Sequence, residues 1–236
     1  MLLFSFLQTF ILVDLLHFLR TIFGVAPHTV GRPFTSSGRS LIAAGYAVYS
    51  SSTELVLSLG ESGSNGCVGF TLDQALVYQR MLHDENDLVD CFIVSRPQMT
   101  CPINGPYYSL NEGREPDWPD GLRQWIHDAK RGQTPLKTTF SSRYICSLCA
   151  DFHRTLIKGG WAGNPRPHLR LLYEALPLAH IAEACGGKGS DGKVNLLDLT
   201  PECLHERTCV FLGSIDVINE LEKYGNIQQG TKRYSS

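Results

Sequence analysis

The segment Ser142–Glu174 constrains the fold more than any other stretch of the sequence. Apolar residues recur at helical spacing across Ile145–Leu156, which predicts a helix with one buried face. Gly159 and Gly160 end this helix, because glycine tolerates the left-handed conformation that helix ends require. A polar loop follows, and then the strand-like sequence LRLLYE, which ends in a carboxylate. The chain therefore combines helices with strands.

The start of the predicted helix carries two side chains that suit a phosphate. Ser141 or Ser142 can cap the helix, so that Arg143 and Tyr144 lie in its first turn. The backbone N–H groups of a first turn have no acceptor within the helix. A guanidinium and a phenol beside such N–H groups predict a phosphate-binding corner.

Glu174 lies at the start of a second predicted helix, because Pro177 is tolerated only in a first turn. This helix continues through His180 and ends at Gly186-Gly187. Two roles fit Glu174. It caps its own helix, or it holds a divalent metal while the helix dipole faces a phosphate.

Several separate segments resemble the C-terminal half of the fructose-1,6-bisphosphatase family, in the order of that family. They are YSLNEG (108–113), RYICSLCADFHRTLIKGG, LRLLYEALPLA, EACGGKGSDGK and ECLHERTCVFLGS. The segments DWPDGLR and GWAGNPRPH resemble a plastid-type branch. This resemblance implies a layered α-β-α-β-α sugar-phosphatase fold and magnesium-dependent hydrolysis of the 1-phosphate of fructose 1,6-bisphosphate.

The resemblance also implies roles for individual residues. Asn111, Arg143 and Tyr144 match positions that bind the sugar's 6-phosphate. Arg170 matches a basic substrate-binding position near the metal end, and Glu174 matches a magnesium ligand. In the family, the residue at the position of Arg143 reaches into the neighbouring subunit's site, so we expect a homo-oligomer, either a dimer or a tetramer.

Three positions in the matching segments depart from the family pattern. Arg114 and Asn164 stand where many members have tyrosine, and His168 stands where they have lysine. Arg166 is a candidate to restore the lost cation. These changes bear on substrate selectivity, and sedoheptulose bisphosphate is the competing substrate.

The front of the family's first subdomain has no counterpart here. TIFG (21–24) matches a family strand, but the aspartate-rich metal motif D-P-x-D-G-[ST]-S does not precede it. We assign residues 1–20 to an apolar segment outside the family pattern and 21–106 to an incomplete N-terminal subdomain with an insertion at 77–89. Residues 107–229 form the C-terminal subdomain, and 230–236 form a tail.

Catalysis is the function that this incomplete match affects most. Because one carboxylate cannot hold two or three metal ions, we expect the chain as written to be nearly inactive. The alternative is a catalytically incomplete homologue that only associates with intact subunits.

Composition excludes some classes of protein. A net charge of −2 gives no electrostatic footprint for nucleic acid. Eight cysteines in 236 residues are too few for a disulfide scaffold, so we expect reduced thiols. The apolar run at 1–13 is too short for a membrane span and lacks a secretory signal's positive start, so we interpret it as a buried helix. These features favour a cytoplasmic protein, with the plastid as the alternative.

The remaining patterns favour structural roles. Apolar spacing predicts a helix at 37–49, whereas 53–59 and 67–72 alternate as the two strands of a hairpin. Cys146-x-x-Cys149 lies inside the predicted helix, which favours core packing over redox or zinc chemistry. The P-loop-like run 187–193 lacks the required Ser or Thr and precedes a predicted strand at 194–199, so we interpret it as a turn.

Overall fold

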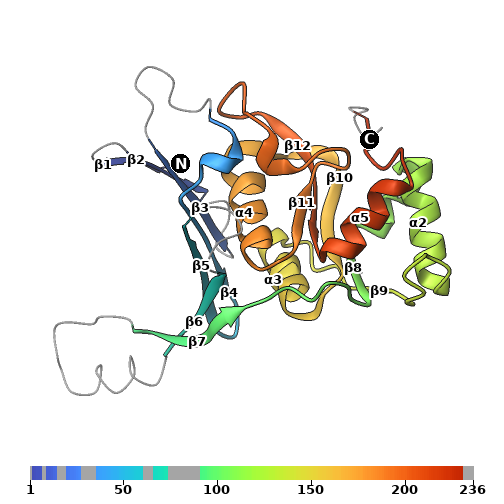
Figure 1. Cartoon of the computed structure of the whole chain (residues 1–236), viewed down its shortest axis with the longest axis horizontal. Coiled ribbons are helices and arrows are strands. Elements are labelled where there is room, and N and C mark those ends of the chain that lie inside the picture. Colours follow the sequence, from blue (N-terminus) through green and yellow to red (C-terminus); the bar gives the residue numbers. More distant parts are fainter. Residues whose placement is uncertain are drawn as a thin grey trace.

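The computed structural model describes residues 20–27, 36–60, 66–73 and 91–230, together with the backbone of two strands at 2–6 and 9–14. The predicted insertion at 77–89 and residues 231–236 of the predicted tail lie outside the described residues. Figure 1 shows the described chain as alternating layers: a first sheet, a pair of helices, a second sheet and an outer pair of helices. The structure therefore has the layered α/β arrangement that the resemblance implied.

The first sheet is an antiparallel meander in which each strand pairs with the next along the chain. Its strands are β1 (Leu2–Phe6), β2 (Thr9–Asp14), β3 (Arg20–Pro27), β4 (Ala43–Tyr49), β5 (Thr53–Leu59), β6 (Cys67–Leu72) and β7 (Phe92–Met99). The predicted hairpin of β5 and β6 is confirmed, with Leu57 opposite Val68.

Two helices, α3 (Leu148–Lys158) and α4 (Leu176–Ala184), lie between the sheets. They pack on Ile22, Tyr46 and Val56 of the first sheet through one shared apolar core. The close approach of β3 to α4 depends on Gly24, because a Cβ atom there would lie 3.1 Å from the Pro177 ring. Proline in the first turn of α4 agrees with the sequence prediction.

The second sheet mixes parallel and antiparallel pairs in the order β11-β12-β10-β8-β9. Its strands are β8 (Tyr107–Ser109), β9 (Ser141–Ser142), β10 (Trp161–Arg170), β11 (Lys188–Ser190) and β12 (Arg207–Gly213). Helices α2 (Asp120–Arg131) and α5 (Ile215–Lys223) cover its far side. Buried rings of Trp125, Trp161 and Phe211 join these layers, with the two Trp centroids 5.7 Å apart.

Two helix predictions in the first sheet are wrong. The apolar run at the N-terminus forms β1 and β2 instead of a helix, and β2 pairs with β3. Residues 37–49 form a 3-10 turn at Gly38–Ser40 followed by strand β4. Both runs are apolar on successive residues, which makes a two-sided strand indistinguishable from a helix by periodicity alone.

The connection between β10 and α4 also differs from the prediction. The segment 161–168, interpreted as a loop, belongs to β10, and LRLLYE leaves the sheet at Arg170 to form a π-helical turn at Leu171–Ala175. The carboxylate of Glu174 accepts a hydrogen bond of 2.8 Å from the Arg170 backbone N–H, which closes this turn. The strand predicted at 194–199 is a 3-10 turn at Leu196–Asp198, capped by Asn195.

Candidate functional site

A cavity of about 350 Å³ lies beside β8, β10 and the loop that precedes α3. Arginine and polar side chains from segments far apart in the sequence line it. The polar and charged lining residues are Arg20, Ser109, Asn111, Arg114, Tyr144, Ser147, Asp151, Asn164, Arg166, His168 and Gln229. This chemistry differs from the apolar core on either side.

The charge of the cavity is strongly positive. Three arginines line it, namely Arg20, Arg114 and Arg166. The carboxylate among its lining residues, Asp151, forms an ion pair of 2.7 Å with Arg154 and also accepts the Ile145 backbone N–H. Guanidinium groups bind phosphate oxygens with directed, charge-assisted hydrogen bonds. The cavity can therefore hold a phosphorylated ligand.

The protonation of His168 reflects the same positive field. Partial burial lowers the pKa of this imidazole, and the positive charges of Arg166, Arg207 and Arg170 lower it further. Its Nδ1 lies 3.2 Å from the Arg166 guanidinium and 3.3 Å from that of Arg207, which fits an acceptor nitrogen of a neutral ring. The lowered pKa of His168 favours the neutral form of its ring in the cavity wall.

The structure brings Asn111 and Tyr144 to this one cavity. Asn111 follows β8 and caps a 3-10 turn at Glu112–Asp117, because its Oδ1 accepts from the Gly113 N–H at 3.1 Å. Tyr144 donates its hydroxyl to the Cys146 sulfur at 3.2 Å. These two predicted binding residues are 33 positions apart in the sequence and share a cavity through the pairing of β8 with β9.

Arg143 lies beside the cavity and is not among its lining residues. Its backbone N–H donates to the Tyr108 carbonyl at 2.8 Å, and its guanidinium lies over the Tyr107 ring, 5.2 Å from the centroid. The side chain is exposed. This position suits a contact outside its own chain better than a contact inside the cavity.

The predicted helix N-terminus at Arg143 is wrong. Helix α3 begins at Leu148, and residues 143–147 form a loop in which Cys146 has a φ of 66°. The carboxylate of Asp151 takes the Ile145 N–H, which holds this loop open instead of letting the helix extend. Cys146 is therefore exposed and precedes the helix, while Cys149 is buried within it.

Arg170 and Glu174 lie together at the turn that follows β10, and neither is among the residues that line the cavity. The Arg170 guanidinium bonds the Tyr173 hydroxyl at 3.0 Å, so its side chain is directed to that ring. Glu174 is buried, and its Oε1 forms an ion pair of 3.1 Å with Arg20. Arg20 thus lines the cavity and neutralises Glu174.

The residues described here do not fit a magnesium site. Magnesium prefers several oxygen ligands in octahedral geometry. One Glu174 oxygen faces the Arg20 guanidinium and the other accepts a backbone N–H. Among the described residues, no group of three or more His, Cys, Asp or Glu side chains could hold a metal.

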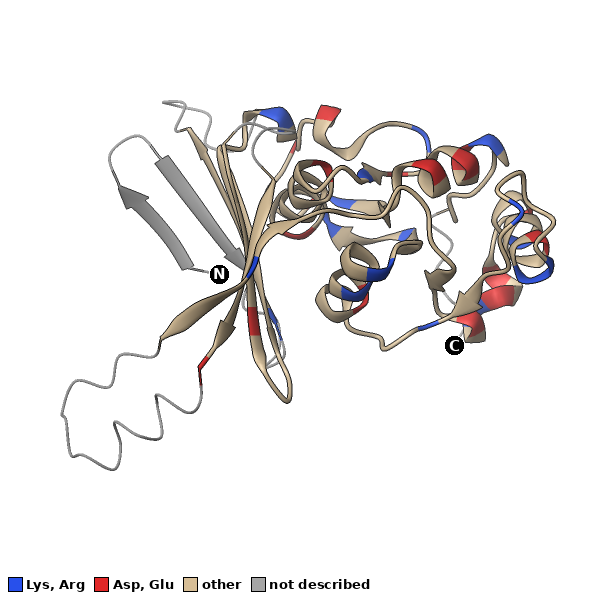
Figure 2. Ribbon diagram, turned by 60° about the horizontal axis from the view of Figure 1, so that its bottom comes forward, with Lys and Arg blue, Asp and Glu red and all other residues tan. Residues whose placement is uncertain are grey.

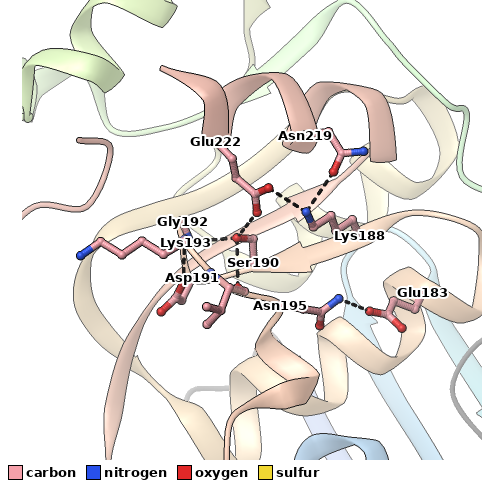
Figure 3. Close-up of polar contacts among 10 residues, drawn as sticks. Glu183, Lys188, Ser190, Asp191, Gly192, Lys193, Asn195, Asn219 and Glu222 are labelled. Atoms are coloured by element: carbon pink, nitrogen blue, oxygen red, sulfur yellow. Dashed lines mark hydrogen bonds and ion pairs between the residues drawn. The ribbon is translucent and has the colours of Figure 1, made fainter. Parts of the chain in front are cut away.

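The P-loop-like run forms β11 and a turn that satisfies its own N–H groups, as Figure 3 shows. The Ser190 hydroxyl accepts from the Gly192 N–H at 2.9 Å, and the Asp191 carboxylate accepts from the N–H groups of Lys193 and Val194. Glu222 holds Lys188 at 2.7 Å. These donors do not face a phosphate, so a turn is the better description.

Sequence reasoning missed Arg20 and Asp151. Arg20 precedes the TIFG strand and shares the inward alternation of Ile22 and Gly24. A charged residue at an inward strand position needs a partner, and that rule points to a buried carboxylate such as Glu174. Nothing in the local pattern identifies Asp151, whose role depends on the loop before α3.

The fold and the cavity together define a layered α/β protein with an arginine-lined anion pocket. A model of the fructose-1-6-bisphosphatase C-terminal domain matches residues 101–226. Fructose-1,6-bisphosphatase 1, chloroplastic, from Arabidopsis thaliana is 41% identical over 193 residues, which are 79% of this chain and 42% of the relative.

Solved structures agree with these sequence matches. A crystal structure of Leishmania major fructose-1,6-bisphosphatase in the T-state matches with a TM-score of 0.74 at 32% identity, covering 87% of this chain and 63% of that one. The holo form gives the same TM-score and coverage at 34% identity. The chain belongs to the fructose-1,6-bisphosphatase family, and it spans less than half the length of the curated relative.

Proposed function

We propose that the chain binds the 6-phosphate end of fructose 1,6-bisphosphate in the arginine-lined cavity. Asn111 and Tyr144 contact the phosphate, and Arg166 supplies the cation that His168 no longer provides. Arg143 serves the site of a neighbouring subunit in a dimer or tetramer. The single observation that carries this proposal is the convergence of three arginines on one cavity whose carboxylate is already paired.

Hydrolysis of the 1-phosphate is the reaction that family membership implies, and the resemblance implies magnesium for it, with Glu174 as a ligand and Arg170 as a substrate contact near it. In the described residues Arg20 and a backbone N–H occupy the Glu174 carboxylate, so we propose no metal-bound step for them. Since Arg20 occupies one of the Glu174 oxygens, the described residues supply no route for hydrolysis by themselves. Ligand binding, not turnover, is therefore what we expect of this chain alone.

Calorimetric titration with fructose 6-phosphate tests the binding proposal. Arg166→Met should weaken binding about 10- to 100-fold, because a hydrogen bond to a charged group contributes about 1.5–3 kcal/mol. Arg131→Met removes the same charge from α2, where Arg131 bonds the His127 carbonyl, and should leave the affinity unchanged. Equal losses in both variants, or no binding by the unaltered chain, would reject the proposal.

The proposal also covers the carbon-chain length of the sugar substrate and the cellular compartment of the protein. Asn164 and Arg114 line the cavity in place of family tyrosines, so sedoheptulose 7-phosphate is the comparison ligand in the same titration. The similarity to a chloroplastic enzyme favours the plastid over the cytoplasm. In the described part of the chain, no helix is long and apolar enough to cross a membrane.

The second candidate function is association with intact subunits of the family. Two observations favour it. The side chain of Arg143 is exposed and so accessible to another subunit, and the carboxylate of Glu174 is paired with Arg20. Mixing the chain with an intact relative and measuring phosphate release tests it. A change in release that Arg143→Ala abolishes would support a subunit role, whereas no change at any mixing ratio would exclude it.

A further inference from the structure

A row of positive side chains leads from the arginine-lined cavity to the end of β10. His168 lines the cavity, and its Nδ1 lies 3.2 Å from the Arg166 guanidinium and 3.3 Å from that of Arg207. Arg207 also donates to the His168 carbonyl at 2.7 Å. His168 therefore stands between an arginine of the cavity and an arginine of β12.

Arg170 belongs to the same row, although it does not line the cavity. Successive side chains of a strand point to opposite sides, and Leu169 is buried in the core between the sheets. The side chains of His168 and Arg170 therefore share the other side of β10. Burial is the largest cause that lowers the pKa of His168, and the charges of Arg166, Arg207 and Arg170 follow it in that order.

Arg170 and Arg207 are directly opposite each other in the antiparallel pair of β10 and β12. The Cβ atoms of such a pair are roughly 5 Å apart, and like charges in this arrangement destabilise a sheet. In the described part of the chain, neither guanidinium forms an ion pair with Asp or Glu. Glu206, the residue before Arg207, accepts the Glu202 N–H at 2.6 Å instead. An anion between the two arginines would remove their repulsion.

The two strands carry no acid that could offset these charges. β10 and β12 contain arginines but no Asp or Glu, so their ribbons in Figure 2 are tan and blue, and the red segments lie on other elements. Guanidinium groups bind phosphate with directed, charge-assisted hydrogen bonds. The strand ends therefore offer the chemistry of a phosphate site.

Two aromatic side chains fix the direction of the Arg170 guanidinium. Its Nε donates to the Tyr173 hydroxyl at 3.0 Å, and that hydroxyl lies 3.0 Å from the Nδ1 of His205. Because the Tyr173 oxygen accepts from Arg170, its own hydrogen is available to His205. With Nε held in this way, the terminal nitrogens of Arg170 are the ones that remain for a ligand.

We propose that Arg170 and Arg207 hold the second phosphate of a sugar bisphosphate without a metal ion, and that Tyr173 positions Arg170 for this contact. The proposal rests on the proposed function, because the first phosphate occupies the arginine-lined cavity. The described residues do not fit magnesium at Glu174, whose carboxylate is taken by Arg20 and a backbone N–H. Guanidinium groups here supply the positive charge that the resemblance assigned to magnesium.

The arrangement of the arginines favours a ligand with two anionic groups over a ligand with one. A monophosphate bound in the cavity leaves Arg170 and Arg207 facing each other. A bisphosphate with its first phosphate in the cavity can place the second between them.

Calorimetric titration in a chelator, with fructose 1,6-bisphosphate and separately with fructose 6-phosphate, tests the proposal. We call the ratio of the fructose 6-phosphate dissociation constant to that of the bisphosphate the bisphosphate preference. We expect a preference of about 10- to 100-fold, because hydrogen bonds from charged groups change affinity by about that factor. Arg170→Met and Arg207→Met should each lower the preference about 10-fold and leave fructose 6-phosphate binding little changed.

The matched control is Arg131→Met, which removes the same charge from α2, where Arg131 bonds the His127 carbonyl. It should change neither dissociation constant. Fructose 6-phosphate binding by each variant also confirms that the variant is folded.

A double-mutant cycle tests the positioning role of Tyr173. Tyr173→Phe keeps the ring and removes the hydroxyl, and should lower the bisphosphate preference about 2- to 10-fold. In the Arg170→Met background it should have no further effect, because the hydroxyl acts through Arg170. A purely structural role would weaken both ligands in both backgrounds. Tyr224→Phe, which removes a hydroxyl that bonds Asp128 at 3.1 Å, should leave the preference unchanged.

Equal affinity for the two ligands in the chelator would reject the second phosphate site and leave the proposed function standing. A preference that appears only with magnesium would assign the second phosphate to a metal, and one that both arginine variants retain would place it elsewhere. Binding of neither ligand would reject the proposed function and this proposal together.

Discussion

At the scale of single residues, Arg20 joins the two chemical features of the site. It lines the anion cavity and neutralises Glu174, whose side chain is 4% exposed, while its own is 19% exposed. A buried carboxylate is costly unless it is paired and hydrogen-bonded. Arg20 therefore acts as the counter-ion of Glu174 in a protein whose described residues do not fit a metal there.

Replacing Arg20 tests this pairing. We expect Arg20→Met to lower the free energy of unfolding by about 3 kcal/mol, the lower end for breaking a buried ion pair, because Arg20 retains some solvent contact. Arg39→Met is the matched control, since Arg39 pairs with Glu183 and Asp198 at the surface and should cost about 1 kcal/mol or less. Urea unfolding measures both, and equal costs would contradict the assignment.

His168 gives the site a pH dependence. Burial and then the positive charges of the arginines lower its pKa, which favours the neutral ring in the free chain. A bound phosphate offsets the arginines and raises this pKa, which means that protonation and binding favour each other. The affinity ratio of the unaltered chain to His168→Asn should therefore increase from about pH 8 to about pH 6, the range where histidine titrates.

The measurement is the ratio of two dissociation constants for fructose 6-phosphate. Taking a ratio removes the titration of the phosphate itself, which has a pKa near 6. His127→Asn, on the exposed side of α2, should follow the unaltered chain at every pH. An affinity ratio for His168→Asn that does not change with pH would show that ligand binding does not alter the pKa of His168.

At the scale of elements, the junction between α3 and β10 positions the cavity wall. Gly159 and Gly160 have φ values of 77° and 92°, which confirms the predicted glycine end of α3. Gly160 also packs against the β8 segment, because a Cβ atom there would lie 1.8 Å from the Tyr107 carbonyl oxygen. Backbone shape and close packing therefore both require glycine at this position.

Two glycine substitutions separate these effects. Gly225 has a φ of 71°, and no atom lies within 4 Å of a Cβ atom placed there. Gly225→Ala should therefore lower the free energy of unfolding by only about 1–2 kcal/mol, the cost of left-handed backbone strain. Gly160→Ala adds a backbone clash and should cost at least about 3 kcal/mol or prevent folding. Thermal and urea unfolding of both variants test this, and similar costs would rule out the clash.

The elements that sequence reasoning predicted correctly carry strong local signals. The β5–β6 hairpin alternates, and α4 has a proline in its first turn. The start of α3 was missed because the Asp151 carboxylate, eight positions after Arg143, accepts the Ile145 N–H across a loop, and local periodicity does not reveal such a contact. Strand β4 was missed because its outward residues are as apolar as its inward ones.

At the scale of the whole molecule, the resemblance predicted the layered fold correctly, since the anion-cavity segments match a family in order. It could not predict the ion pair of Arg20 with Glu174, because that contact joins β3 to the turn before α4 across 154 positions. Long-range pairing of this kind leaves no signal in local periodicity.

The central claim is that this chain keeps a working anion pocket whose neighbouring carboxylate is neutralised by arginine instead of a metal. Calorimetric titration with fructose 6-phosphate, in magnesium and again in a chelator, tests it most directly. We predict the same dissociation constant in both. Binding that requires magnesium would contradict the account.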